Sequence, residues 1–181
     1  MDFILKNKRF MIFALKFFLL FCLFYYASLA IIGFSSPGGY YIVWIDHYFN
    51  YIQWVKMSLI RAVEFFSYLF GYKTVIEGND LIRFEHARGV RIAMSCLGIG
   101  VLSFWAAFVV SDNKVFLKKM TWLFFGLIVL WLINVMRILL FLFSINLGWS
   151  MPFGFDHHTW FNIQAYLAIF IMIYFYEKSS K

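Results

Sequence analysis

Four long apolar runs constrain what this chain can fold into more than any other feature of its sequence. The first of them, residues 17–34, has no charged residue over 18 positions, which is about the length that a helix needs to cross a bilayer. The other three are residues 94–110, 120–143 and 160–176. They predict an all-α membrane protein with about four transmembrane helices, built as a single integral membrane domain over residues 1–181.

The composition of the chain agrees with lipid as its main solvent. Hydrophobic residues make up 64% of the sequence and Phe alone accounts for 25 residues, whereas soluble domains are about 45–50% apolar. The formal net charge is +7, but the basic residues are scattered and form no tract that alternates with aromatics, as in proteins that bind single-stranded nucleic acid. Nucleic-acid binding is therefore excluded, and the positive charge bears on membrane topology and on anionic lipid head groups.

The distribution of lysine predicts which ends of the spans face the cytoplasm. Lysines occur near the N-terminus, within residues 111–119 and at the C-terminus, and positively charged loops stay on the cytoplasmic side. Residues 35–93 and 144–155 are then assigned to the outside. The first run exceeds the roughly 7–15 residues of a signal-peptide core, so we expect an uncleaved span. The sequence thus predicts a multi-pass protein of the cytoplasmic (inner) membrane with both chain ends in the cytoplasm.

Residues 44–70 are apolar but are interrupted at helical spacing. Six polar or charged positions predict a polar stripe along one helix: Asp46, Asn50, Gln53, Arg61, Glu64 and Ser67. We expect an amphipathic helix that lies in the membrane interface, with Trp44 and Trp54 at head-group level. A fifth spanning helix, which would hide the stripe inside the bundle, is the alternative.

The polar stretch of the chain covers residues 72–92. Residues 72–76 and Leu81–Phe84 flank Glu77-Gly78-Asn79-Asp80, a sequence that suits the turn of a short hairpin. The stretch carries both signs of charge, as is typical of a small structure in water. It predicts a hairpin or loop cap outside the membrane.

Three chemically active groups fall toward the outer side of this topology. Cys96 is near the start of the second run, Arg137 lies in the third, and Asp156-His157-His158 opens the fourth. At 1.5 Å per residue, Arg137 is roughly 9 Å from the outer end of its helix. The thiol, the guanidinium and the imidazoles are therefore expected near one another, with Asp156 as an N-cap of the last helix.

Two of these residues also have a simpler interpretation. A charge inside a span costs about 2.5–3.5 kcal/mol on insertion scales and normally faces a cavity or a partner, but Arg137 can instead extend to the outer head groups. Asn134, one turn earlier on the same helix face, favours the inward orientation. Cys96 can be a small buried apolar residue, as we expect for Cys22. A position at a helix N-terminus near cations instead favours its thiolate form.

The histidines raise the question of a metal or a haem. His47, His86, His157 and His158 lack the spacing of known zinc motifs, so no metal and no cofactor are expected. A single histidine is usually an ordinary polar residue. Two together at a membrane surface, with Asn162 one turn later, instead indicate a functional site.

The three motifs together resemble the exosortase/archaeosortase family of membrane cysteine transpeptidases. Ser95-Cys96-Leu97-Gly98-Ile99 begins a span, Asn134-Val135-Met136-Arg137-Ile138 lies within the next, and Asp156-His157-His158 opens the last. Their order, spacing and membrane placement match over roughly residues 72–176. Each motif is weak alone, and the ordered set of three is fairly specific.

The resemblance implies a catalytic set made of a nucleophile, a transition-state stabiliser and an acid–base: Cys96, Arg137, and His158 or His157, respectively. His158 is favoured because Asn162 and Tyr166 fall on its helix face. The implied substrates are exported client proteins that carry a C-terminal transmembrane sorting signal. The implied site faces the outside of the cytoplasmic membrane.

The chain also departs from that family. Leu97 stands where members commonly have a small residue, and many members have more spans than this short chain. A compact variant fits these differences, and so does an inactive relative. The alternative function is a non-enzymatic membrane subunit, such as a transporter component or a scaffold for envelope polysaccharide assembly. In that case Arg137 binds an anion or a partner helix and Cys96 only fills space.

Overall fold

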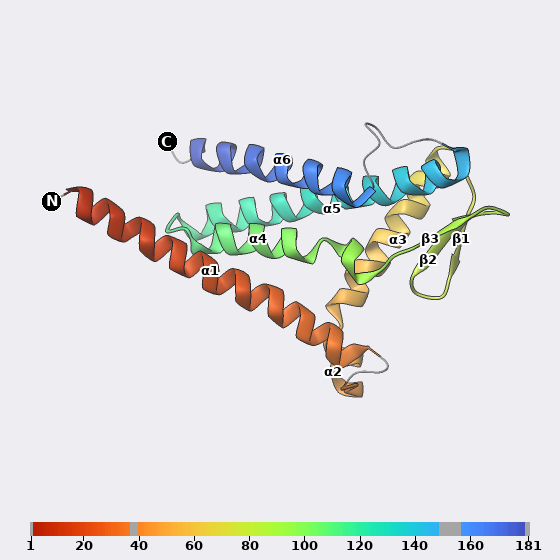
Figure 1. Cartoon of the computed structure of the whole chain (residues 1–181), viewed down its shortest axis with the longest axis horizontal. Coiled ribbons are helices and arrows are strands. Elements are labelled where there is room, and N and C mark those ends of the chain that lie inside the picture. Colours follow the sequence, from red (N-terminus) through yellow and green to blue (C-terminus); the bar gives the residue numbers. More distant parts are fainter. Residues whose placement is uncertain (1, 37–39, 149–156, 180–181) are drawn as a thin grey trace.

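The computed structural model of the chain describes residues 2–36, 40–148 and 157–179, without the side chains of 2–7, Ser95, His157 and His158. The described part is mostly helical (Figure 1). Its elements in chain order are α1 (Asp2–Ser35), α2 (Val43–Phe49), α3 (Tyr51–Leu69), β1 (Thr74–Glu77), β2 (Leu81–Phe84), β3 (Gly89–Arg91), the 3-10 turn η1 (Met94–Leu97), α4 (Ile99–Ser111), α5 (Phe116–Leu147) and α6 (His157–Lys178). The sheet stands at one end of a bundle made by α1, α4, α5 and α6 (Figure 1).

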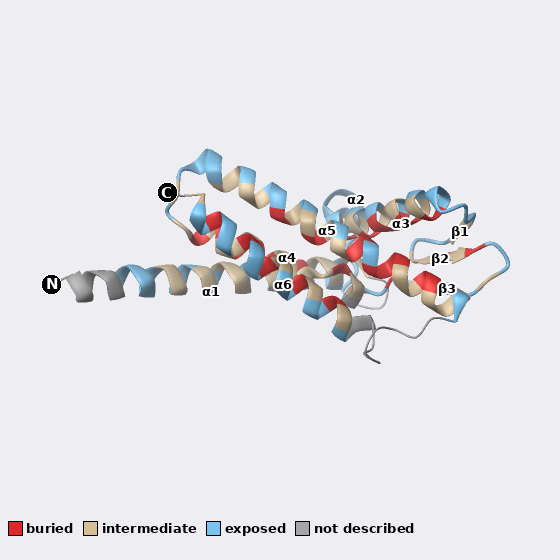
Figure 2. Ribbon diagram, turned by 90° about the horizontal axis from the view of Figure 1, so that it is seen from above, coloured by how far each residue is buried: buried red, intermediate tan, exposed pale blue. Residues whose placement is uncertain are grey.

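Three helices are long and apolar enough to cross a membrane: Lys8–Ser35 of α1, the whole of α5, and Thr159–Lys178 of α6. They correspond to the first, third and fourth apolar runs. In α1 only 6% of the most apolar window is buried, against 44% in α5. In Figure 2 the coloured part of α1 that projects beyond the other helices has the colours of exposed and intermediate residues. α5 is the central helix, since it packs against α3, α4, α6 and β3.

The second apolar run, residues 94–110, does not form the single spanning helix that was predicted. It begins with η1 and continues after Gly98 as α4, a helix of 13 residues. At 1.5 Å per residue α4 is about 20 Å long, which is shorter than the roughly 30 Å hydrocarbon core of a bilayer. The break has a local cause: Gly98 adopts a left-handed conformation (φ 68°), which glycine reaches without steric cost.

The helix predicted over residues 44–70 is divided in two at Asn50. The side-chain oxygen of Asn50 caps α3 by accepting a hydrogen bond from the backbone N–H of Gln53 (3.0 Å). α3 then crosses the end of the bundle at a steep angle to α5 (Figure 1). It is not among the helices that are long and apolar enough to cross a membrane.

The polar stripe predicted for this segment is only partly exposed. Arg61 and Glu64 form an ion pair at the surface of α3 (2.9 Å). Ser67, in contrast, is buried, and so is Lys56, which had not been assigned to the stripe. These two polar residues are buried because α3 packs one face against α5 and the sheet in a common core.

The polar stretch folds into a three-stranded antiparallel sheet in the order β1-β2-β3. β1 and β2 form the predicted hairpin, with Glu77 opposite Leu81 beside the turn. β3 was not predicted; it pairs with β2 through Ile82 and Val90. Both of these side chains are buried in the core that α3 and α5 share with the sheet, so the sheet covers this end of the bundle.

The opposite end of the bundle holds the first turn of α1, the last turn of α6 and the connection between α4 and α5 (Figure 1). The hydroxyl of Tyr176 donates to Asp112 Oδ2 (2.9 Å). Lys114 Nζ lies 3.4 Å from the centre of the Tyr176 ring and 3.2 Å from Glu177. These contacts attach the end of α6 to the α4–α5 connection, so the lysines of these two segments lie at the same end of the bundle, away from the sheet (Figure 1).

Candidate functional site

Two polar side chains are buried one turn apart on α5. Asn134 is 3% exposed and Arg137 is 6% exposed, although their neighbours Leu130, Val135 and Ile138 are apolar. A guanidinium this deeply buried has lost its water and must regain hydrogen bonds inside the protein. Arg137 therefore faces the interior and does not extend to the lipid head groups.

Both α5 side chains contact Cys96 in η1. Nδ2 of Asn134 donates to the carbonyl oxygen of Cys96 (2.8 Å), and Nη2 of Arg137 donates to its sulfur (3.6 Å). The two bonds hold the backbone and the thiol of Cys96 against one face of α5. Of the residues predicted for the site, the structure thus brings Cys96 and Arg137 into direct contact.

The expectation that Cys96 stands at a helix N-terminus is wrong. Cys96 is the third residue of η1, its backbone N–H bonds to the carbonyl of Ala93 (2.9 Å), and α4 begins only at Ile99. Dipole effects are confined to the first turn of a helix, and Cys96 precedes the first turn of α4. Arg137 Nη2 is a cationic donor in contact with the Cys96 sulfur.

A third polar residue of α5, Asn146, fixes the segment that leads to Cys96. Its Oδ1 accepts from the backbone N–H of Arg88 (3.0 Å) and its Nδ2 donates to the Arg88 carbonyl (3.0 Å). Arg88 immediately precedes β3, and β3 leads into η1. The sequence analysis missed Asn146, although an asparagine near the end of an apolar helix is a usable signal for such a contact.

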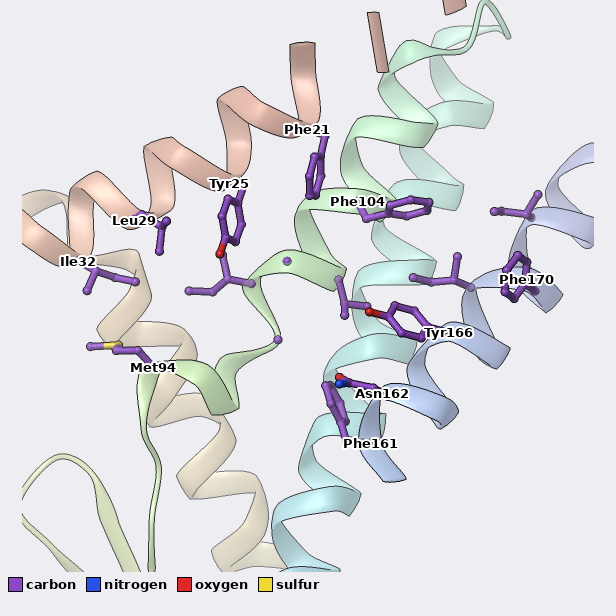
Figure 3. A pocket seen from close by; sticks show the side chains of 16 residues that line it. Phe21, Tyr25, Leu29, Ile32, Met94, Phe104, Phe161, Asn162, Tyr166 and Phe170 are labelled. Carbon is purple, nitrogen blue, oxygen red and sulfur yellow. The ribbon is translucent and has the colours of Figure 1, made fainter. Parts of the chain in front are cut away.

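α6 adds an aromatic ring, Phe161, that the sequence analysis also missed. Cζ of Arg137 lies 4.6 Å from the centre of this ring, close enough for a cation–π interaction. Phe161 also lines a cavity of about 740 Å³ between α1, α4 and α6 (Figure 3). Most of the cavity wall is apolar or aromatic, and Tyr25, Asn162 and Tyr166 add polar atoms to it.

His157 and His158 are the first two residues of α6. Their side chains, and the whole of Asp156, lie outside the described residues, so their predicted roles as acid–base and N-cap stay predictions. Phe161, which touches Arg137, follows His157 by four residues, which is about one helical turn. The backbone of His157, one of the two histidines predicted as the acid–base, therefore lies about one helical turn from Phe161, the residue of α6 that contacts Arg137.

The geometry suits the chemistry of acyl transfer. If the Cys96 sulfur attacked a carbonyl carbon, a donor 3.6 Å from that sulfur could also reach the oxyanion that forms on the attached carbon. Asn134 Oδ1 is buried and has no hydrogen-bond partner among the described residues. Cys22 lies in α1, and both cysteines are free thiols.

Comparison of the chain with protein-family models, with curated proteins and with solved structures finds no match.

Proposed function

We propose that this chain is an exosortase-like membrane cysteine transpeptidase, which cleaves the C-terminal sorting signal of exported proteins at the outer face of the cytoplasmic membrane. The contact between Arg137 Nη2 and Cys96 Sγ (3.6 Å) carries this proposal. Burying a guanidinium beside a thiol costs more free energy than filling the same space with an apolar side chain. The pair is therefore poorly explained by packing and is well suited to reaction chemistry.

The proposal includes four membrane crossings, of which α4 together with η1 is the shortest. The lysine-rich end, with Lys114, Lys118, Lys119 and Lys178, is assigned to the cytoplasm by the positive-inside rule. The sheet and the Cys96–Arg137 pair then belong to the outer side. At the break before α4 the Cys96 carbonyl accepts a hydrogen bond from Asn134 Nδ2 (2.8 Å), and a broken helix at membrane depth is tolerated where protein groups satisfy its backbone in this way.

In the proposed reaction the sulfur of Cys96, as its thiolate, attacks the carbonyl carbon of the scissile peptide bond and forms a C–S bond. The carbonyl electron pair moves onto oxygen, and Arg137 donates hydrogen bonds to this oxyanion. Collapse of the tetrahedral intermediate breaks the C–N bond, and the leaving amine takes a proton from His158 or His157. The acyl group stays on Cys96 as a thioester.

The thioester is then transferred to an acceptor nucleophile or to water. The histidine takes the proton of the acceptor, the acceptor oxygen or nitrogen bonds to the acyl carbon, and the sulfur leaves as the thiolate. Asn134 supports both steps because its bond to the Cys96 carbonyl (2.8 Å) limits movement of η1. A strong acceptor gives transfer to an envelope anchor, and water gives proteolysis.

The experiment that tests the proposal traps the thioester. Chain carrying Cys22→Ala is isolated from native membranes after an acid quench, and mass spectrometry searches for a peptide attached to Cys96. We expect an adduct in this variant and none in Cys96→Ala, which should also abolish client processing while leaving the chain inserted. Unchanged client processing in Cys96→Ala would refute the nucleophile assignment.

The two cysteines also separate an enzyme from a non-enzymatic membrane subunit. Cys22 in α1 is a matched thiol in the same chain, with no arginine contact among the hydrogen bonds of the described residues. If Cys96 is a nucleophile, a small membrane-permeant alkylating reagent should modify it faster than Cys22. Equal rates would favour the subunit reading, in which Cys96 is a packing residue.

A further inference from the structure

Phe161 contacts Arg137 and also lies beside Gly98, two residues after Cys96. One side of its ring lies at the Arg137 guanidinium, 4.6 Å from Cζ. The ring edge lies beside Gly98, because a Cβ built on Gly98 would be 3.4 Å from Phe161 Cζ. Gly98 ends the turn that holds Cys96, so the ring is packed between the guanidinium of α5 and the end of η1.

The same ring both contacts Arg137 and lines the apolar cavity. Phe161 and Gly98 line that cavity, whereas neither Cys96 nor Arg137 is among the described residues that line it. Figure 3 shows Phe161 beside Asn162 near the start of α6, at the edge of the cavity. Phe161 is 5% exposed, so its ring is held in place by its surroundings.

We propose that Phe161 is a positioning residue, whose ring holds the Arg137 guanidinium against the Cys96 sulfur. A planar guanidinium stacks on an aromatic face, and this contact restricts the direction in which its N–H groups point. An aliphatic side chain fills similar space but has no negative ring face. The catalytic meaning of this role rests on the proposed function, whereas its effect on the thiol does not.

The effect on the thiol is measured as the rate at which N-ethylmaleimide modifies Cys96 in full-length protein carrying Cys22→Ala in lipid nanodiscs. N-ethylmaleimide reacts with the thiolate form of a cysteine. A nearby guanidinium stabilises a thiolate, and this increases the thiolate fraction by the largest factor at low pH, where most thiol groups are protonated. The readout is the ratio of the rate at about pH 9 to the rate at about pH 6. A change in access to the thiol alone multiplies both rates and leaves this ratio unchanged.

We expect Arg137→Gln and Phe161→Leu each to raise this ratio about threefold or more. Phe161→Tyr keeps an aromatic face and should leave the ratio at its parent value. Phe170→Leu is the matched control, because Phe170 lies on the same helix and lines the same cavity; it should also leave the ratio unchanged. Should Phe161→Leu fail to accumulate, pentafluorophenylalanine at position 161 keeps the ring shape, reverses its charge distribution and should raise the ratio.

A parent-like ratio in Phe161→Leu, together with a raised ratio in Arg137→Gln, would overturn the inference. So would a parent-like ratio in Arg137→Gln, since the guanidinium would then not act on the thiol. The proposed function fails by a different observation, the absence of a thioester on Cys96. If clients are processed, Phe161→Leu should lower kcat several-fold and leave KM near its parent value, because the ring acts on the pair and not on the substrate.

Discussion

Trp105 of α4 lies directly on Gly126 of α5, so closely that a Cβ atom built on Gly126 would stand 2.0 Å from the indole Nε1. Trp105 is fully buried. Its Nε1 lies within hydrogen-bonding distance of the carbonyl oxygens of Trp122 (3.2 Å) and Leu123 (3.3 Å), to which it donates. A glycine at position 126 is what lets the indole reach the backbone of α5.

Gly126→Ala should therefore weaken the packing of α4 on α5. The added methyl group has to displace a fully buried indole, which costs about 1–3 kcal/mol in a tightly packed core. The measurement is the melting temperature of purified protein in detergent. Gly33→Ala in α1 is the control, because its Cβ meets nothing within 4 Å and alanine favours helix. Equal melting temperatures for the two variants would show that the helices do not approach this closely.

Gly98 and Gly100 are two residues apart, so their alanine variants allow a second comparison of melting temperatures. Gly98→Ala places a side chain at φ 68° and 3.4 Å from Phe161, and the left-handed backbone alone costs about 1–2 kcal/mol. Gly100→Ala meets only Tyr25, at 3.8 Å, which is an ordinary contact. We expect Gly98→Ala to melt at a clearly lower temperature than Gly100→Ala. Similar melting temperatures for the two variants would contradict the left-handed conformation of Gly98 between η1 and α4.

The features that the sequence predicted are those that local patterns encode. Length and apolarity identify α1, α5 and α6, and the turn residues around Gly78 identify the β1–β2 hairpin. The break at Gly98 was missed because a glycine within an apolar run does not by itself show whether a helix continues through it. β3 was missed because three residues are too short for a periodic pattern.

The candidate site shows the same distinction between residues that a local pattern predicts and residues that only a tertiary contact reveals. Asn134 and Arg137 were predicted on one face of a helix because they are three residues apart. Asn146 and Phe161 were missed because their partners, Arg88 and Arg137, are distant in the chain, and a tertiary contact leaves no pattern in a single sequence. The contacts of Asn146 and Phe161 therefore required the structure.

Asn146→Ala should loosen the segment between Arg88 and Cys96. The variant removes both hydrogen bonds to the Arg88 backbone, which are worth about 0.5–1.5 kcal/mol each. We expect faster hydrogen exchange at the Arg88 amide, measured by mass spectrometry of peptides that cover β3. Asn79→Ala, in the exposed β1–β2 turn, is the control. If exchange at Arg88 is the same in both variants, Asn146 does not hold this segment.

Arg137→Lys should abolish client processing while leaving the protein inserted in the membrane. Lysine keeps the positive charge but lacks the planar fork of N–H donors that can serve the sulfur and an oxyanion together. Loss of an oxyanion donor lowers kcat by about 10²–10³-fold. Arg83→Lys, in the surface pair with Glu77 (2.6 Å), should process clients normally. Full activity of Arg137→Lys would show that a point charge is sufficient at this position.

The placement of the two bundle ends on opposite sides of the membrane can be tested with single cysteines. Asn79→Cys lies in the exposed β1–β2 turn and Asn113→Cys in the exposed α4–α5 connection, and both are introduced into chain lacking Cys22 and Cys96. A membrane-impermeant maleimide should label position 79 in intact spheroplasts, because the sheet is assigned to the outside. Position 113 should react only after permeabilisation, because the positive-inside rule keeps the neighbouring lysines in the cytoplasm. Labelling of both positions from one side would rule out the four-crossing topology and would leave Cys96 and Arg137 without an assigned side of the membrane.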